Sequence, residues 1–156
     1  MLGCNGLVRL VDSKKLINCV AGVELNYFEP KDAKVPTKVY VLYPFKGNEA
    51  IDPLYLRKSS FFLLGRDRTI VDIPLDHPSC SKQHAVIQFR QRTAENEFGE
   101  KKAIVRPYII DLKSTNGTHL NGTRIDDSRY FELKHKDVLK FGFSSREFVF
   151  MDESAV

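Results

Sequence analysis

Three short polar motifs carry side chains that could bind an anion. In chain order they are Gly65-Arg66, Ser81-Lys82-Gln83-His84 and Ser114-Thr115-Asn116-Gly117-Thr118, and each stands beside an apolar run. A guanidinium, an amine and several hydroxyls are hydrogen-bond donors, and no carboxylate within these motifs competes for them. A dianionic phosphate offers strong acceptor oxygens to such a set. The chemistry that the motifs indicate is therefore phosphate binding.

Arg66 is the first candidate ligand for the phosphate. Gly65 allows the chain to turn sharply, and an Arg presents a planar fork of donors that can contact two oxygens at once, which a Lys cannot match. The alternative is a surface Arg paired with Asp67 or Asp72. The ordered presence of the other two motifs favours phosphate binding.

Ser81 and Lys82 form the second part of the donor set. The Ser81 hydroxyl can donate to an anion, and Lys82 adds positive charge, although a turn serine often bonds only its own backbone. His84 could suggest a general base, but no orienting residue or nucleophile elbow accompanies it. We therefore expect no catalytic residue, and His84 is interpreted as a hydrogen-bonded structural residue at the start of an apolar strand.

Thr115 and Asn116 complete the set. Thr115 adds a hydroxyl, and Asn116 can adopt a left-handed backbone while presenting its amide to the backbone of a ligand. The alternative is an ordinary Asn116-Gly117 tight turn that needs no ligand. Five residues further on, Asn121-Gly122 is interpreted only as such a turn.

Composition favours a single β-rich domain. The 156 residues suffice for one real core, and 42% of them are hydrophobic. Eleven Phe and six Tyr with no Trp favour a sheet, because aromatic side chains fit a pleated surface. The net charge of +4 allows acidic or phosphorylated partners without indicating a nucleic-acid-binding stripe.

Cysteine usage and hydropathy exclude several classes. Cys4, Cys19 and Cys80 are odd in number and show no CxxC spacing, so neither a disulfide framework nor a zinc site is expected. A reducing, intracellular setting follows. No apolar run reaches the roughly 18 residues that span a bilayer, and no secretory signal is evident at the start. We expect no membrane association, no metal and no cofactor.

Short apolar runs separated by turn residues predict the elements that position the motifs. The predicted strands are 39–43, 61–64, 70–73, 85–90, 103–112, 130–133, 138–141 and 148–151. The first is expected to stop at Pro44, and an edge or bulge is expected at Pro107. Many short strands without a helical apolar face indicate an all-β sandwich.

The two loops that hold Arg66 and Ser81 would lie at opposite strand ends in a simple meander. They converge only if the strand between them, at 70–73, is very short, since three residues span about 10 Å.

The first 36 residues differ from the rest. Their apolar residues follow no clean period, and Pro30 and Pro36 bracket a predicted linker. The segment is either a strand pair against the domain or a docking segment that orders on a partner. We therefore divide the chain into an arm and linker (1–36), the sandwich (37–152) and a short tail (153–156).

From about Lys38 to Met151 the motifs resemble the forkhead-associated (FHA) family. The resemblance implies a sandwich of about eleven strands with an N-terminal extension, which binds phosphothreonine through loops at one end. It further implies that Arg66, Ser81, Lys82 and Thr115 contact the phosphate, that Asn116 contacts the peptide backbone, and that four residues shape the loops: Gly65, His84, Gly117 and Asn121. The residue two places before the motif serine, often basic in the family, is Ser79 here.

A narrower resemblance covers about residues 23–151. Segments such as Leu42-Tyr43-Pro44-Phe45-Lys46-Gly47 and Asp76-His77-Pro78-Ser79-Cys80-Ser81 are similar to the FHA subunit of the pre-mRNA retention and splicing complex, the Smad nuclear-interacting protein family. The resemblance implies a nuclear, spliceosome-associated protein, with the cytoplasm left open as a second location. It also implies three partners: a phosphothreonine-containing ligand protein, an RNA-recognition-motif subunit and a scaffold subunit. The two subunits would bind to a docking segment N-terminal to the FHA domain.

Two other functions stay open. The first is a phospho-independent scaffold with an idle pocket, for which loss of Arg66 or Ser81 would be the expected sign; both are present. The second is direct RNA binding, which the modest charge and the lack of an aromatic RNA-recognition signature disfavour. No sequence-specific nucleic-acid binding is therefore expected.

Overall fold

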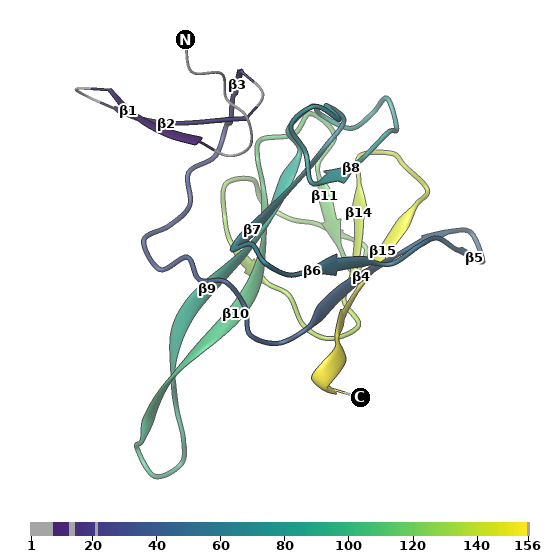
Figure 1. Cartoon of the computed structure of the whole chain (residues 1–156). Coiled ribbons are helices and arrows are strands. Elements are labelled where there is room, and N and C mark those ends of the chain that lie inside the picture. Colours follow the sequence, from purple (N-terminus) through teal and green to yellow (C-terminus); the bar gives the residue numbers. More distant parts are fainter. Residues whose placement is uncertain (1–7, 13–14, 21, 156) are drawn as a thin grey trace.

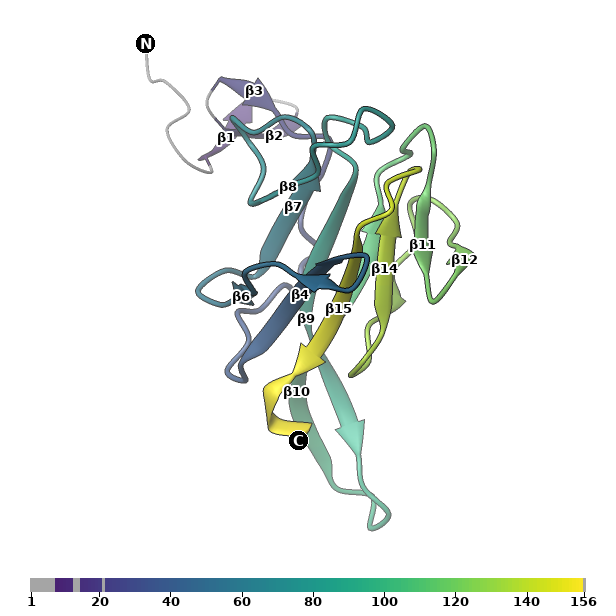
Figure 2. The same cartoon turned by 90° about the vertical axis from the view of Figure 1, so that its right-hand side faces the viewer.

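The computed structural model describes residues 8–12, 15–20 and 22–155, with side chains described from Gly22 onward. Two β-sheets pack face to face (Figures 1 and 2). The first has the order β13-β10-β9-β7-β8 and consists of β7 (Phe61–Gly65), β8 (Ile73–Pro74), β9 (Ala85–Glu95), β10 (Lys101–Asp111) and β13 (Phe131–Glu132).

The second sheet follows the order β12-β11-β14-β15-β4-β5, and β6 also pairs with β4. Its strands are β4 (Tyr40–Lys46), β5 (Glu49–Ala50), β6 (Leu54–Leu56), β11 (Thr118–Leu120), β12 (Thr123–Arg124), β14 (Val138–Phe141) and β15 (Glu147–Asp152). The expected all-β sandwich is confirmed. From Tyr40 onward the described chain forms twelve strands, several only two residues long.

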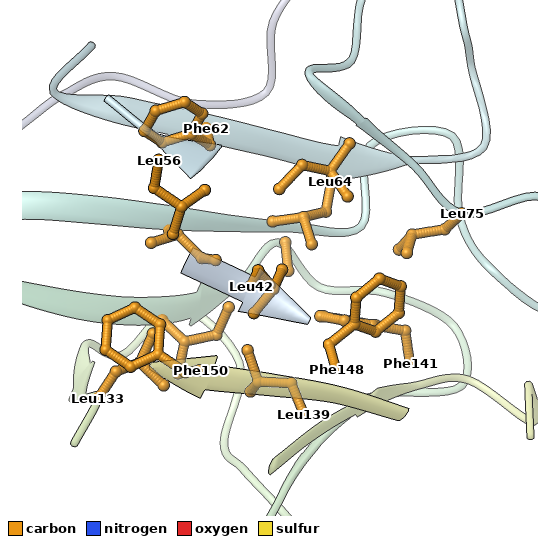
Figure 3. Close-up of a cluster of buried hydrophobic side chains, with 14 of the residues drawn as sticks. Leu42, Leu56, Phe62, Leu64, Leu75, Leu133, Leu139, Phe141, Phe148 and Phe150 are labelled. Atoms are coloured by element: carbon orange, nitrogen blue, oxygen red, sulfur yellow. The ribbon is translucent and has the colours of Figure 1, made fainter. Parts of the chain in front are cut away.

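The core lies between the two sheets. Phe62 and Leu64 of β7 face Leu42 of β4 and Phe150 of β15 (Figure 3), and none of these four is more than 8% exposed. Full burial of one such side chain stabilises the fold by about 1.5–3 kcal/mol. The alternating apolar residues thus hold the sandwich rigid, and its end loops project from a fixed frame.

Two prolines lie within strands. β4 continues through Pro44 to Lys46, so the expectation that this strand stops at Pro44 was wrong. β10 runs without a bulge through Pro107, but β13 pairs with β10 only at Tyr108 and Ile109, so the expected edge is found at Pro107. Each proline carbonyl accepts an N–H on the side away from the long partner strand, from Ile51 and Leu133 respectively. The missing proline N–H therefore faces that same outer side, and no bond to the partner strand is lost.

β8 explains how the loops that carry Arg66 and Ser81 meet. It is only two residues long, shorter than the predicted strand 70–73, and it pairs in parallel with the end of β7 at Leu64 and Gly65. The chain then enters β9, which is antiparallel to β7. Both loops consequently lie at the same end of the sandwich.

Other element boundaries also differ from the predictions. β9 and β10 extend well past the core as a twisted hairpin, which Figure 2 shows projecting below the sandwich. The predicted long connection 45–60 contains the two short strands β5 and β6. In the described part of the chain the only helix is the 3-10 turn Glu153–Ala155, which is far too short to span a bilayer.

The N-terminal segment contains a small sheet of β1 (Val8–Asp12), β2 (Lys15–Val20) and β3 (Val23–Glu24), joined in that order. Cys4 lies outside the described residues. After β3 the chain packs on the outer face of the first sheet: Leu25 and Tyr27 are buried in a second apolar cluster with Phe61 and Val86. The division of the chain at residue 36 stays a prediction, but a cut there would remove these core contacts.

Candidate functional site

Ser81 joins the three motif loops. Its carbonyl oxygen accepts the backbone N–H of Arg66 at 3.0 Å, and its hydroxyl oxygen accepts the backbone N–H of Thr115 at 3.2 Å. Because the oxygen is the acceptor in the latter bond, the hydroxyl hydrogen of Ser81 is available to a ligand. The structure thus brings Arg66, Ser81, Lys82 and Thr115 together at one end of the sandwich.

The side chain of Arg66 is fixed at one nitrogen and open at two. Its Nε donates to the carbonyl oxygen of Cys80 at 3.0 Å, which orients the guanidinium. Among the described residues no acceptor binds its two terminal nitrogens, and the residue is exposed. A guanidinium anchored in this way keeps a fork of donors for a phosphate.

The acids that were considered as partners of Arg66 are engaged elsewhere. Asp67 accepts two hydrogen bonds from Thr69, which hold the pKa of its carboxyl below the usual range. Asp72 accepts the backbone N–H of Leu63 at 2.8 Å. In the described part of the chain neither acid forms an ion pair with Arg66, so the paired-surface-Arg alternative is not what the structure contains.

Lys82, which follows Ser81, and Thr115, whose backbone N–H bonds to Ser81, are both exposed. Within the described ranges no acid forms an ion pair with Lys82. By contrast, the nearby Arg68 makes two hydrogen bonds to Asp76, at 2.8 and 2.6 Å, and is thereby neutralised. The positive charge left for a ligand is consequently concentrated at Arg66 and Lys82.

Asn116 connects its loop to the loop before Ser81. Its Nδ2 donates to the carbonyl oxygen of Ser79 at 2.8 Å, while the side chain is half-buried. This bond leaves the side-chain oxygen without a partner among the described residues. An amide with one fixed donor and one open acceptor can receive a backbone N–H from a bound peptide.

His84 lies fully buried beneath the loops and connects two of them. Its Nδ1 accepts the backbone N–H of Ser81 at 3.1 Å, so the ring proton lies on Nε2, which is 2.9 Å from the carbonyl oxygen of Gly117. Burial lowers the pKa of the imidazole below its usual range, which keeps the ring neutral. The ring holds Ser81 from below and does not face the loop surface.

Two glycines allow the loops to approach one another. A Cβ at Gly65 would collide with the backbone carbonyl of Lys82. Gly117 has φ +83°, and a Cβ there would collide with the side chain of Arg124. Asn121, in contrast, lies at the far end of β11, where Asn121 and Gly122 both have positive φ and close the hairpin to β12. It does not join the cluster of motif loops.

Several residues that position the site were not assigned a role from the sequence. Asp111 is buried and accepts the N–H and the hydroxyl of Ser114 together with the hydroxyl of Thr118, which shapes the loop between them. The Asp-x-x-Ser spacing was a readable signal for this turn. The carbonyl groups of Ser79 and Cys80 also hold site residues, but any residue type supplies a carbonyl, so no sequence signal marks them.

The site offers hydrogen-bond donors and no metal ligands. Among the described residues no cluster of three or more His, Cys, Asp or Glu side chains could hold a metal ion. Burial also raises the pKa of the Cys80 thiol, which disfavours the reactive thiolate. The arrangement is therefore suited to holding an anion.

The chain resembles known proteins in both sequence and fold. Residues 62–142 match the model of the FHA domain family. Smad nuclear-interacting protein 1 of Mus musculus is 54% identical over 138 residues, which cover 88% of this chain and 36% of the mouse protein. The chain thus spans about a third of the length of that relative.

Two solved structures extend the comparison. The yeast Pml1 splicing factor, described with its integration into the RES complex, is 32% identical with a TM-score of 0.68 and covers 81% of this chain and 96% of its own. The MEK1 FHA domain in complex with a HOP1 phosphothreonine peptide is 28% identical with a TM-score of 0.51, covering 71% and 95% respectively.

Proposed function

The chain belongs to the FHA domain family, and we propose that it binds phosphothreonine in partner proteins through Arg66, Ser81, Lys82 and Thr115. The observation that carries the proposal is the donor set itself: Arg66 and Lys82 are exposed, Ser81 is half-buried between the loops that it joins, and no described acid forms an ion pair with either cation. Asn116 would contact the backbone of the peptide. The function is recognition, without catalysis, cofactor or metal.

The similarity to a phosphopeptide complex supports the ligand class. The MEK1 FHA domain has been solved with a phosphothreonine peptide, and its sandwich superposes on most of this chain. The motif loops of this chain combine a guanidinium, a hydroxyl and an amine. Each of these groups can donate short, strong hydrogen bonds to a phosphate. Gly65, His84 and Gly117 would keep the loops in place, and Asn121 would keep the β11–β12 turn.

We further propose that this module belongs to a nuclear splicing complex. The relatives that carry this proposal are named a nuclear-interacting protein and a splicing factor that integrates into the RES complex. The ligand would be a phosphothreonine-containing protein, and an RNA-recognition-motif subunit and a scaffold subunit would be the stable partners. The arm 1–36 is the proposed docking segment, and the sandwich 37–152 is the proposed reader.

Titrating one peptide in three forms tests the ligand. A peptide selected from a phosphothreonine library should bind most tightly in its phosphothreonine form. The phosphoserine form should bind more weakly by a factor of about ten or more, and the unmodified threonine form should bind far more weakly still. One buried methyl group is worth about 0.8 kcal/mol, and its restriction of χ1 adds to the gap. Equal affinity for the threonine and phosphothreonine forms would instead favour the scaffold with an idle pocket.

A matched pair of variants tests the residues. Arg66→Ala should abolish measurable binding, because an unpaired phosphate charge costs about 2–5 kcal/mol. Arg68→Ala is the control: it removes the same side chain two residues away, where the guanidinium is already paired with Asp76. Calorimetry with both variants, alongside melting curves, refutes the site if Arg66→Ala binds normally.

Docking is tested separately by shortening the arm. Deleting residues 1–22 keeps Leu25 and Tyr27, which pack on the sandwich, and should leave phosphopeptide binding intact. Capture of the RNA-recognition-motif subunit should weaken. Undiminished capture would place the docking surface on the remaining residues.

A further inference from the structure

A groove of about 630 Å³ lies far from the motif loops. β10 passes beside it at Lys102–Pro107 and reaches the motif-loop end only at Asp111, so Lys102 and Asp111 are about 30 Å apart along the strand. Figure 2 shows this end of the molecule, where the β9–β10 hairpin projects past the start of β4 and the end of β15. The groove is thus separate from the proposed phosphothreonine site.

The floor of the groove is apolar. Tyr40, Leu133 and Phe150 are buried there, and Val105 is half-buried beside them. These side chains belong to the edge of the main core, where β10 continues past the opposite sheet. A ligand with apolar side chains at every second position could place them on this floor.

The rim of the groove is positively charged. Five basic side chains and two acidic ones line it, and the two acids are paired: Asp152 with Lys38 at 3.7 Å and Glu132 with Arg106 at 3.1 Å. The remaining cations are exposed, and none of them forms an ion pair with a described residue: Lys34, Lys102 and Lys134. An excess of three positive charges therefore surrounds an apolar floor.

The edge of β10 along this groove has unpaired backbone groups. Opposite Pro107, both backbone groups of Phe89 bond away from β10, to Ser60 and Lys34. In an antiparallel ladder, residues 103 and 105 share this orientation, so their N–H and C=O groups point to the outer edge. Among the described strands, β13 pairs with β10 only at Tyr108 and Ile109, which leaves that edge open beside the groove.

We propose that an extended acidic segment of a partner protein docks in this groove as an added strand on β10. Its backbone would bond the open groups of Ala103 and Val105, its alternate apolar side chains would cover Val105 and Phe150, and its carboxylates would meet Lys102 and Lys134. The charge selects this occupant: lysines on an open edge repel a second copy of the same basic strand and attract an acidic one.

The probe is a fluorescein-labelled ten-residue peptide of alternating Glu and Val, measured by anisotropy at low salt. Two control peptides keep parts of its chemistry. One carries N-methyl groups at alternate residues, which keeps the charge but prevents strand pairing, and one replaces Glu with Lys. Wild type should bind the Glu-Val peptide and should not bind the Lys peptide. It should bind the N-methylated peptide at least about fivefold more weakly, since each lost hydrogen bond contributes about 1 kcal/mol.

Three variants separate the groove from other basic surfaces. Lys102→Glu with Lys134→Glu should weaken the Glu-Val peptide by about tenfold or more, because two attractive contacts become repulsive. Lys46→Glu with Lys140→Glu makes the same change in net charge outside the groove and should leave binding unchanged. Arg66→Ala should also leave it unchanged, which distinguishes this groove from the phosphothreonine site.

A fourth variant tests the strand edge. Ala103→Pro removes an outward N–H without removing a bond to β9, and its expected effect is about fivefold weaker binding with an unaltered melting curve. The proposal is overturned if wild type does not bind the Glu-Val peptide, if both double variants bind it equally well, or if the N-methylated peptide binds as tightly as the parent. It is also overturned if polyuridine RNA is bound through Lys102 and Lys134 in place of the peptide.

Discussion

Two arginine side chains of this molecule have the same guanidinium chemistry but opposite roles. On the outer face of the first sheet, Arg90 makes hydrogen bonds of 2.7 and 3.0 Å to Asp32 and stacks on the ring of Tyr130, 4.6 Å from its centroid. At the motif loops, the side chain of Arg66 bonds only the carbonyl of Cys80 within the described chain. One guanidinium is satisfied by the protein, and the other keeps two nitrogens for a ligand.

The difference lies in the acids. Asp32 reaches both Arg90 and Arg92, and the hydrogen bond from Arg90 lowers the pKa of the Asp32 carboxyl. This pair fastens the segment after β3 to the sheet. Around Arg66 the acids are directed to Thr69 and Leu63 instead. A cationic side chain thus stabilises the fold where a carboxylate meets it and is available for binding where none does.

Placing a carboxylate in the donor set should have the largest effect. Lys82→Glu would set a negative charge beside Arg66, which would pair the guanidinium and repel the phosphate. Like-charge contacts cost several kcal/mol, so phosphopeptide affinity should fall by at least about 100-fold. Isothermal calorimetry measures this loss. Lys46→Glu makes the same change at an exposed position outside the motif loops and should keep phosphopeptide affinity within about threefold. A similar loss of affinity in this variant would mean that net charge, and not the position of Lys82, causes the effect.

Removing the support beneath the loops should reduce stability next. His84→Ala deletes a buried ring that accepts from Ser81 and lies at hydrogen-bond distance from Gly117. The unsatisfied groups cost about 1–3 kcal/mol in free energy of unfolding, measured by urea titration. His119→Ala is the control on a half-buried histidine of β11. An unchanged unfolding free energy with lost phosphopeptide binding would make His84 a ligand contact.

Breaking the ion pair between Asp32 and Arg90 should destabilise the fold without affecting phosphopeptide binding. Asp32→Asn leaves Arg90, whose side chain is only 16% exposed, without its charge partner. The expected cost is about 1–2 kcal/mol of unfolding free energy with unchanged phosphopeptide affinity. Asp126→Asn breaks the exposed pair with Arg129 and should cost at most about 0.5 kcal/mol. If Asp32→Asn weakens phosphopeptide binding as much as stability, the two clusters are coupled.

The smallest effect concerns pH. The pKa of His84 is lowered in the folded state, whereas an unfolded histidine titrates near about 6.5. Below that pH the unfolded chain binds a proton that the folded chain excludes, so stability falls on acidification from about pH 7.5 to 5.5. His84→Gln should flatten this part of the profile. An unfolding free energy that rises with acidification in wild type would contradict the neutral, buried ring.

The positions of the motif loops could be predicted from the sequence, but the way in which these loops come together could not. Gly65-Arg66 and Ser81-Lys82 could be assigned to turns because their flanking runs are apolar. That these turns share one end of the sandwich depends on β8, two residues whose parallel pairing leaves no pattern in the sequence. The position of Arg66 likewise depends on a backbone carbonyl, which carries no residue signature.

The segment after β3 has no sequence pattern that predicts where it packs. Leu25 and Tyr27 are buried while Asn26 and Phe28 are exposed, an alternation too short to register as a strand. Its attachment depends on partners more than 50 residues away, such as Arg90, and on the hydrogen bond of 2.6 Å between Tyr27 and Gln88. Such long-range contacts leave no local pattern in the sequence.

The most direct test of the account is an amide-shift map by NMR. Titrating the labelled protein with a library-selected phosphothreonine peptide should move the amide signals of Arg66, Ser81, Lys82 and Thr115. In the structure Arg66 and Thr115 each bond to Ser81, and Lys82 follows Ser81 in the same loop. The signals of Asp32, Arg90 and Tyr130 should stay in place, since that cluster is already satisfied. Shifts confined to the Arg90 face or the β10 groove, or no shifts at saturating peptide, would contradict the assignment of the motif loops as the phosphothreonine site.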